Sequence, residues 1–285
     1  MNINWYPGHM VKAKRAIEEN IKLVDIVVML LDARAPFSCR NPELEKIARR
    51  KKIVMVLNKA DLAASASTKA YIKKLTDQGM VAVAMDSIHG KGQKEVIEAL
   101  RMAYQDKADI MISKGNRVRP ARVMITGVPN IGKSTFLNTL VGQKAARTGA
   151  KPGITRGKQW VRVRDDIEFM DTPGLMWPKI DNTEQGLKLA LLNIIGENAY
   201  KEEEVALYLI NILQTRFPKV LSDYYKVTDL GVSNAEILEQ ISRKRGHLLK
   251  GGSLDLEKTC KHLLIDYRSG TLGRISLDDD YLTQA

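Results

Sequence analysis

Residues 127–134 have the composition and spacing of a phosphate-binding loop. They read Gly-Val-Pro-Asn-Ile-Gly-Lys-Ser and match the pattern GxxxxGK[ST], with a β-branched run before them and a helical stretch after them. In this context we expect the backbone N–H groups of the loop to bind phosphates, Lys133 to reach the β- and γ-phosphates, and Ser134 to hold Mg²⁺. The segment predicts a nucleoside triphosphate but does not choose the base. The residues expected to line this side of the site are Asn130, Ile131, Gly132, Lys133, Ser134 and Thr135.

The base is indicated by the segment Asn58-Lys59-Ala60-Asp61, which follows another apolar run. A carboxylate at Asp61 can accept hydrogen bonds from both N1–H and the exocyclic amine of guanine, and adenine offers no such pair of donors. Asn58 can bond to the purine edge, and the aliphatic part of Lys59 can lie along the ring. Ser87 follows the next apolar run, where GTPases have a short loop whose backbone contacts guanine O6, although the usual Ser-Ala pair is Ser-Ile here. Together with the phosphate loop, these residues predict GTP.

Two further segments have the composition of GTPase switch regions. Asp171-Thr172-Pro173-Gly174 matches DxxG, so we expect Asp171 to bind Mg²⁺ through water and the Gly174 N–H to sense the γ-phosphate. Thr155 lies between this segment and the phosphate loop, and it is the expected switch threonine that closes on Mg²⁺ and the γ-phosphate. Leu175 stands where many GTPases have the glutamine that orients the attacking water, so we hypothesise that His9 takes that role. The residues expected to act in catalysis are His9, Lys133, Thr155 and Gly174.

The elements that must position these residues alternate along the first part of the chain. Continuous β-branched runs and one hairpin predict strands, and helical stretches such as 66–78 and 92–105 separate them, which favours an α/β fold with helices on both sides of a parallel sheet. The strands are expected over 24–32, 53–58, 81–86, 122–127, 159–164 and 167–171. After about residue 179 apolar residues recur at helical spacing, over 183–195, 202–215, 217–225, 233–246 and 254–269. We therefore expect a GTPase domain over 1–178 and a small all-α domain over 179–285.

The order of the motifs is unusual. In a common GTPase the phosphate loop comes first and NKxD comes late, whereas here NKxD at 58–61 precedes the phosphate loop and DxxG comes last. The expected fold class is therefore an α/β P-loop GTPase domain with circularly permuted motif order, followed by the all-α domain. Residues 106–120 would join the former termini, which is feasible because domain termini commonly lie close together on the surface.

Two more segments, Asp32-Ala33-Arg34-Ala35-Pro36 and Pro7-Gly8-His9-Met10, make the whole chain resemble the bacterial ribosome biogenesis GTPase A family. The resemblance implies a GTPase that binds the immature large (50S) ribosomal subunit through ribosomal RNA and proteins, promotes its late maturation and leaves after GTP hydrolysis. It also implies that Asn130 helps to coordinate a K⁺ ion beside the phosphates, which would add positive charge there. Because DxxG runs into the all-α domain, GTP is expected to set the orientation of that domain.

The charge of the chain agrees with a polyanionic partner. Its 285 residues carry 45 Lys+Arg against 33 Asp+Glu, a formal net charge of +12. Basic clusters at 143–164 and 243–250 are expected to face RNA, whereas the cluster at 46–52 is expected to be a solvated helix face. Aromatic residues make up only 6%, so recognition of the RNA backbone and shape is favoured over base stacking.

Several classes of protein are excluded, and two alternatives stay open. No apolar stretch approaches the roughly 20 residues of a membrane span, the N-terminus does not read as a signal peptide, and Cys39 and Cys260 form no disulfide framework or zinc motif. We expect a cytoplasmic monomer that does not bind membranes. The alternatives are a P-loop enzyme that uses GTP to modify RNA or a metabolite, and a membrane-signalling GTPase, for which no lipidation motif is present.

Overall fold

The computed structural model describes residues 3–4, 8–142, 160–170, 172, 174–176, 179–180 and 182–283. The chain divides into two compact units, one of Tyr6–Pro178 with Ser276–Ala285 and one of Met1–Trp5 with Lys179–Ile275. We call them the α/β unit and the all-α unit. From the sequence we expected the whole of 179–285 to belong to the all-α domain, whereas the contacts between residues in the structure group Ser276–Ala285 with the α/β unit. The physical reason is a set of hydrogen bonds from this segment to residues more than 200 positions earlier.

A six-stranded sheet forms the centre of the α/β unit, in the order β4-β3-β2-β5-β7-β6. Five strands are parallel, and β6 pairs antiparallel with β7 at one edge. All seven residues of β2 are buried, as expected for a strand covered on both faces. The predicted strands are confirmed, with the bounds β2 Ile26–Asp32, β3 Lys52–Asn58, β4 Val81–Met85, β5 Ala121–Gly127, β6 Trp160–Arg164 and β7 Ile167–Met170.

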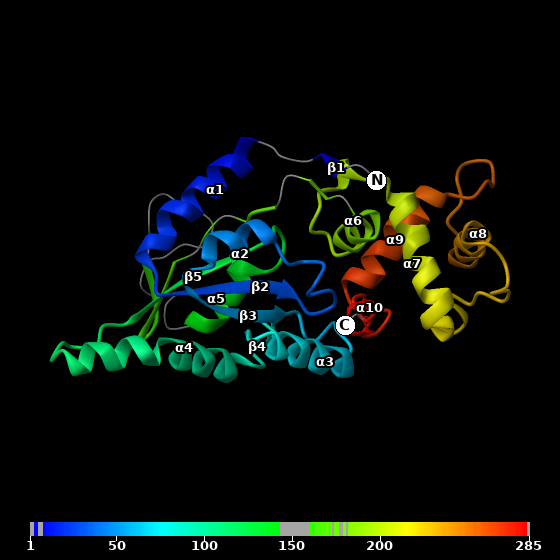
Figure 1. The fold of residues 1–285 in the computed structure, drawn as a ribbon. Helices are drawn as coiled ribbons and strands as arrows, with labels where there is room; N and C mark the ends of the chain where they lie inside the picture. Colours follow the sequence, from blue (N-terminus) through cyan, green and yellow to red (C-terminus); the bar gives the residue numbers. More distant parts are fainter. Residues whose placement is uncertain are drawn as a thin grey trace. The chain divides into compact units, whose positions relative to one another are not determined.

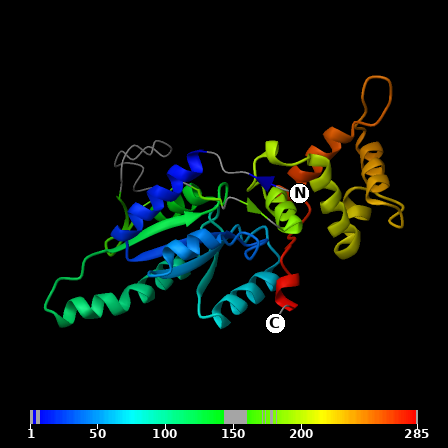
Figure 2. The same ribbon diagram turned by 45° about the horizontal axis from the view of Figure 1, so that its top comes forward.

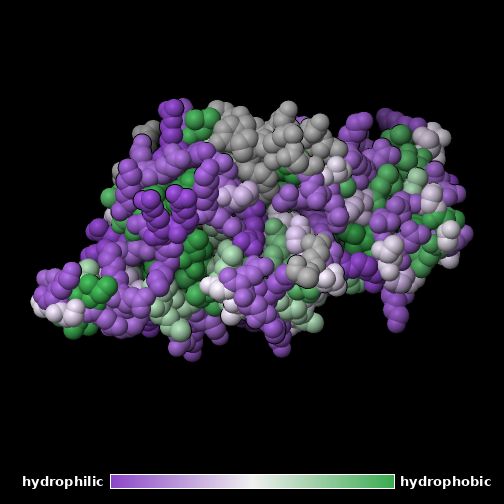
Figure 3. Space-filling view, in the orientation of Figure 1, coloured by the Kyte–Doolittle hydropathy of each residue, from purple (hydrophilic) through white to green (hydrophobic). Residues whose placement is uncertain are grey.

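Helices cover the sheet, with α1 and α2 on one side of the strands and α4 on the other (Figure 1). The predicted helix at 92–105 is longer than expected, because α4 continues to Ser113 into the segment thought to join the former termini. On this extension Ile110 and Ile112 are 55% and 62% exposed, and Figure 3 shows hydrophobic residues at its outer end. The helices of this unit are α1 Gly8–Asn20, α2 Pro42–Ala48, α3 Ser65–Asp77, α4 Gln93–Ser113, α5 Lys133–Val141 and α10 Asp280–Thr283, with a short 3-10 turn, η1, at Ile21–Leu23.

The all-α unit packs its helices around α7, which contacts α6, α8 and α9. Figure 2 shows α8 and α9 joined by an extended loop. The predicted segments form helices, except that 217–225 contains a five-residue π-helix, η4, at Val220–Tyr224. Helix α8 begins with a capping box between Ser233 and Glu236. The elements are β1 Ile3–Asn4 paired with β8 Lys179–Ile180, α6 Thr183–Leu191, η3 Glu197–Ala199, α7 Glu202–Arg216, α8 Asn234–Arg245 and α9 Leu256–Arg268.

Neither cysteine is part of a disulfide: Cys39 and Cys260 are both free and buried. Across the described ranges, none of the helices combines the length and the apolar character needed to cross a membrane.

Candidate nucleotide-binding site

The parallel strands bring the predicted motif residues to one edge of the sheet. Asp32 at the end of β2 is the register partner of Asn58 at the end of β3, and Asn58 is in turn the partner of Met85 on β4. On the other side of β2, Leu30 pairs with Gly127, where the phosphate loop begins. Ligands of open α/β sheets bind at this carboxyl edge, so the strand register alone gathers motifs that lie far apart in sequence.

The phosphate loop has the backbone conformation that its sequence requires. Asn130 and Gly132 have φ angles of +56° and +96°, and a Cβ on Gly132 would lie 2.7 Å from Nδ2 of Asn58. The loop leads into α5, where Ser134 and Thr135 are exposed in the first turn. The open N–H groups of a helix N-terminus favour a bound anion, so this turn can hold phosphate.

Lys133 and Gly174 lie together against the phosphate loop. The ammonium group of Lys133 donates to the carbonyl oxygens of Gly127 at 3.4 Å and Val128 at 3.0 Å. A Cβ on Gly174 would lie 2.9 Å from Lys133 Nζ and 3.0 Å from the backbone of Pro129. The structure therefore brings the glycine of DxxG and the lysine of the phosphate loop side by side.

Asn58 joins the guanine motif to the phosphate loop. Its side chain is buried, donates from Nδ2 to the carbonyl oxygen of Ile131 at 3.0 Å, and accepts at Oδ1 from the Ser87 hydroxyl at 2.6 Å. The carbonyl oxygen of Ser87 accepts from the Thr139 hydroxyl on α5. Three residues predicted for nucleotide binding, Asn58, Ser87 and Ile131, are thus parts of one network.

Lys59 is held by an ion-pair network that the sequence analysis did not find. Its ammonium group lies 3.1 Å from Oδ2 of Asp32 and donates to the carbonyl oxygen of Asn130 at 3.2 Å. Asp32 is fully buried and receives two hydrogen bonds from the guanidinium of Arg34, at 3.0 and 2.9 Å. Burial would raise the pKa of Asp32, but the charges of Arg34 and Lys59 outweigh it and hold that pKa well below its usual range. The Asp-x-Arg spacing after a buried strand is the signal that could have revealed this network.

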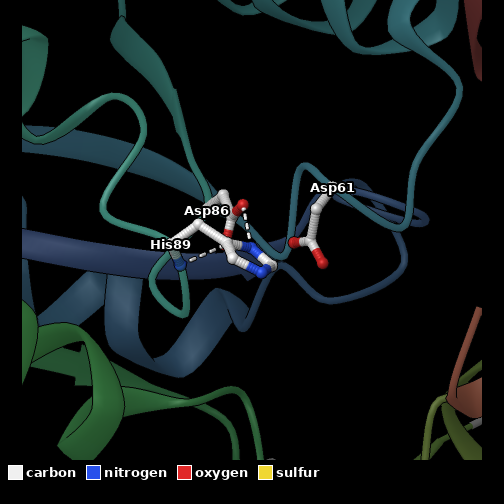
Figure 4. A group of neighbouring side chains, drawn as sticks. All are labelled: Asp61, Asp86 and His89. Carbon is white, nitrogen blue, oxygen red and sulfur yellow. Dashed lines mark hydrogen bonds and ion pairs between the residues drawn. The ribbon is translucent and has the colours of Figure 1, made fainter.

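Asp61 has a carboxylate and an imidazole as neighbours. One oxygen each of Asp61 and Asp86 and one ring nitrogen of His89 lie within 4.8 Å of one another (Figure 4). Asp86 accepts from the N–H groups of Ile88 and His89, both at 3.0 Å, and from Nδ1 of His89 at 2.7 Å. Burial would raise the pKa of Asp86, but these hydrogen bonds lower it. Three donors already occupy Asp86, so its hydrogen bonds account for the cluster without a metal ion.

Three of the predicted residues lie wholly or partly outside the described part of the chain. They are Thr155, Asp171 and the side chain of His9, the second residue of α1. Among the described residues, Ser134 is the proposed Mg²⁺ ligand. Its exposed hydroxyl supplies the hard oxygen donor that Mg²⁺ prefers, so the site fits this ion.

The chain has relatives over its full length. A family described as "50S ribosome-binding GTPase" matches residues 122–244. A ribosome biogenesis GTPase A from Bacillus cereus is 37% identical over 278 residues, which cover 98% of this chain and 94% of that protein. A relative of the same name from Thermotoga maritima is 31% identical and covers 97% of this chain. The crystal structure of GNP-bound YlqF from T. maritima has a TM-score of 0.67 and 28% identity, covering 93% of this chain and 97% of that one.

These similarities agree with the geometry of the site. Identity to the B. cereus protein extends through both units, and the structural match to YlqF does the same. The P-loop fold and the permuted order of the motifs are those expected from the sequence. The chain therefore belongs to the ribosome biogenesis GTPase A family, and it is a GTPase involved in ribosome biogenesis.

Proposed function

We propose that this GTPase binds the immature 50S ribosomal subunit, promotes its late maturation and is released after GTP hydrolysis. The observation that carries the proposal is the Asn58 network, which joins a guanine-specific motif to a phosphate loop in one site. The matched family description and the names of the relatives support a ribosomal partner. The solved structures of YlqF hold GNP and GDP, which supports a guanine nucleotide as the ligand here.

The proposed roles at the nucleotide follow from position. Asp61 accepts from guanine, Asn58 bonds to the purine edge, and the stem of Lys59 lies along the ring between its contacts to Asp32 and Asn130. The backbone at Ser87 contacts guanine O6. The phosphates lie on the turn formed by Asn130, Ile131, Gly132, Lys133, Ser134 and Thr135, and Gly174 contacts the γ-phosphate.

GTPases of this kind use Mg²⁺, and we assign Ser134, Thr155 and Asp171 to it. When bound, the ion neutralises charge that develops on the phosphates. Asn130 is the proposed K⁺ ligand. Its left-handed φ of +56° is also one that asparagine tolerates in any turn, so a direct test is needed. We expect GTP turnover to be faster in KCl than in NaCl at equal ionic strength, and equal rates would remove K⁺ from the mechanism.

His9 is proposed to orient the attacking water. The Leu175 side chain, which stands at the usual glutamine position, is 1% exposed and apolar, so it cannot take this role. Replacement of His9 by Ala should lower ribosome-stimulated turnover and leave the Kd for GTP unchanged. Turnover equal to that of the original chain would exclude His9.

Ribosomal RNA is the proposed contact of the all-α unit. Around the end of α8, Lys244 and Lys250 are exposed, whereas the guanidinium of Arg245 lies over the ring of Tyr224 at 4.6 Å. We propose that Lys244 and Lys250 contact phosphates, together with the predicted cluster at 143–164. Their replacement by Ala should weaken binding to the precursor and reduce its dependence on salt, because each phosphate contact releases counterions.

The test of the whole proposal is sedimentation of the purified chain with precursor particles. We expect the chain to co-sediment with 50S precursors in the presence of a non-hydrolysable GTP analogue and to be released with GDP. We also propose that it acts as a monomer in the cytoplasm. Equal binding with both nucleotides would contradict release on hydrolysis. No binding to any particle, together with modification of RNA or of a metabolite in the presence of GTP, would favour the alternative of a P-loop modifying enzyme.

A further inference from the structure

The end of the chain packs against a loop that borders the nucleotide site. We call residues 276–283 the C-terminal tail and residues 33–41 the Arg34 loop. The N–H of Leu277 donates to the carbonyl oxygen of Arg34 at 2.7 Å. Asp278 accepts from the N–H of Ser38 at 2.8 Å and from its hydroxyl at 2.6 Å, and both residues are fully buried. The tail therefore fixes both the start and the middle of the Arg34 loop.

The tail is itself anchored on α3. The Tyr71 hydroxyl donates to Asp279 at 2.5 Å, and Lys74 donates to the carbonyl oxygen of Tyr281 at the same distance. Figures 1 and 2 both show α10 beside α3, and the ring of Tyr281 stacks on that of Phe37 in the Arg34 loop at 5.3 Å. The tail is thus clamped between α3 and the loop.

The same loop supports the nucleotide site through Arg34. The tail holds the backbone of Arg34, whose side chain is 3% exposed and whose guanidinium binds Asp32. Asp32 in turn holds the ammonium group of Lys59, which contacts the phosphate loop at Asn130. The tail is therefore linked to the lysine of the guanine motif. Leu277, the neighbour of Asp278, bonds to the backbone of Arg34 at 2.7 Å, and side-chain contacts of 2.9–3.1 Å join Arg34 to Asp32 and Asp32 to Lys59.

Loss of the Asp278 carboxylate would act on this path. The N–H of Ser38 is buried, and a buried donor that loses its acceptor is costly, so the Arg34 loop would open to hydrate it. An open loop would also expose the pair of Arg34 and Asp32 to water, which weakens the attraction that fixes Lys59. The affinity for the nucleotide would fall although no residue in contact with it had changed.

We propose that Asp278 is a positioning residue for guanine nucleotides, which acts through the Arg34 loop and Asp32 on Lys59. Asp278 then supports the nucleotide site from a segment that follows the all-α unit in the chain. The proposal rests on the role of Lys59 in nucleotide binding given above.

The test measures the Kd of a fluorescent GDP analogue with the full-length chain. For Asp278→Ala, which removes both acceptor oxygens, we expect the Kd to rise roughly tenfold, within the range of couplings that mutations outside a binding site produce. Asp279→Ala is the matched control, because it makes the same truncation in the same tail but at the bond to Tyr71 on α3. Its Kd should stay within about twofold of the original value. Should Asp278→Ala fail to fold, Ser38→Ala removes one of the two hydrogen bonds to Asp278 and should show a smaller rise.

A double-mutant cycle separates positioning from a general loss of structure. In a Lys59→Ala background, Asp278→Ala should have no further effect on the Kd, because the residue through which it acts is gone. Equal effects in the two backgrounds would overturn the proposal, as would an unchanged Kd in the single variant. Failure of the proposed function gives a different result, since the original chain would then not bind the analogue, or Lys59→Ala would leave its Kd unchanged.

Discussion

Gly132 lies where the phosphate loop packs against Asn58 of the guanine motif, and its replacement by Ala tests that packing. Gly132 has a φ of +96°, and the added Cβ would lie 2.7 Å from Nδ2 of Asn58. Two effects are expected. The left-handed backbone is strained for any residue with a Cβ, and the Asn58 side chain must move away from its two hydrogen-bond partners.

The two effects have separable magnitudes. Left-handed strain costs about 1 kcal/mol, and it should appear alone in Gly79→Ala, because Gly79 has a φ of +78° and no atom within 4 Å of an added Cβ. Each hydrogen bond of Asn58 contributes about 1 kcal/mol. We therefore expect the free energy of unfolding to fall by about 1 kcal/mol in Gly79→Ala and by about 3 kcal/mol in Gly132→Ala.

Urea unfolding followed by tryptophan fluorescence measures this difference, because Trp160 lies in β6 of the central sheet. In an Asn58→Ala background the clash is removed, so Gly132→Ala should cost only the strain of about 1 kcal/mol. A loss of about 3 kcal/mol in both backgrounds would refute the reasoning, because the clash with Asn58 would then not be its cause. The GDP affinity of Gly132→Ala should also fall, while that of Gly79→Ala stays unchanged.

Three further predictions concern stability. Asp32→Asn should lower the free energy of unfolding by about 3 kcal/mol, because it leaves Arg34 buried without its charge partner. In urea titrations the double variant Asp32→Leu/Arg34→Met should recover much of this loss, and no recovery would contradict the reasoning. The pKa values of Asp25 and Asp32 are both lowered in the folded chain, so their stabilisation is present above their ordinary pKa of 3.8 and is lost as the pH falls below it. When the pH is lowered below about 4, the urea concentration at the unfolding midpoint should therefore fall. The fall should be less steep in Asp25→Asn, and an equally steep fall in that variant would exclude Asp25 as a source of the pH dependence. Ser233→Ala should destabilise α8 by about 1 kcal/mol through loss of the capping box, measured as faster hydrogen exchange in its first turn, and unchanged exchange would count against the cap.

The centre of the sheet could be predicted from the sequence because β2 and most of β3 are buried on both faces. The continuous apolar runs 26–31 and 53–57 are recognisable without any knowledge of their neighbours. The length of α4 could not be predicted in the same way. Its last turns extend beyond the sheet contacts, so the apolar periodicity that marks the first turns is absent there.

The nucleotide motifs were recognisable because each is a short, continuous pattern. The network around Lys59 was not, since it joins Asp32, Lys59 and Asn130 from three separate segments. The tail was the hardest part to predict. Asp278 and Ser38 are 240 positions apart, and nothing in either local sequence indicates the other.

The central place of β2 has a consequence for synthesis of the chain. This strand lies between β3, which follows it directly, and β5, which is translated about 90 residues later. A nascent chain that has reached β4 already carries Asp61, the proposed guanine-binding carboxylate, yet one edge of its fully buried strand β2 has no neighbouring strand. Nucleotide capture must wait until β5 and α5 leave the exit tunnel. A strand with an unpaired edge tends to pair with strands of other chains, so this incomplete intermediate is the stage at which chaperones would be most needed.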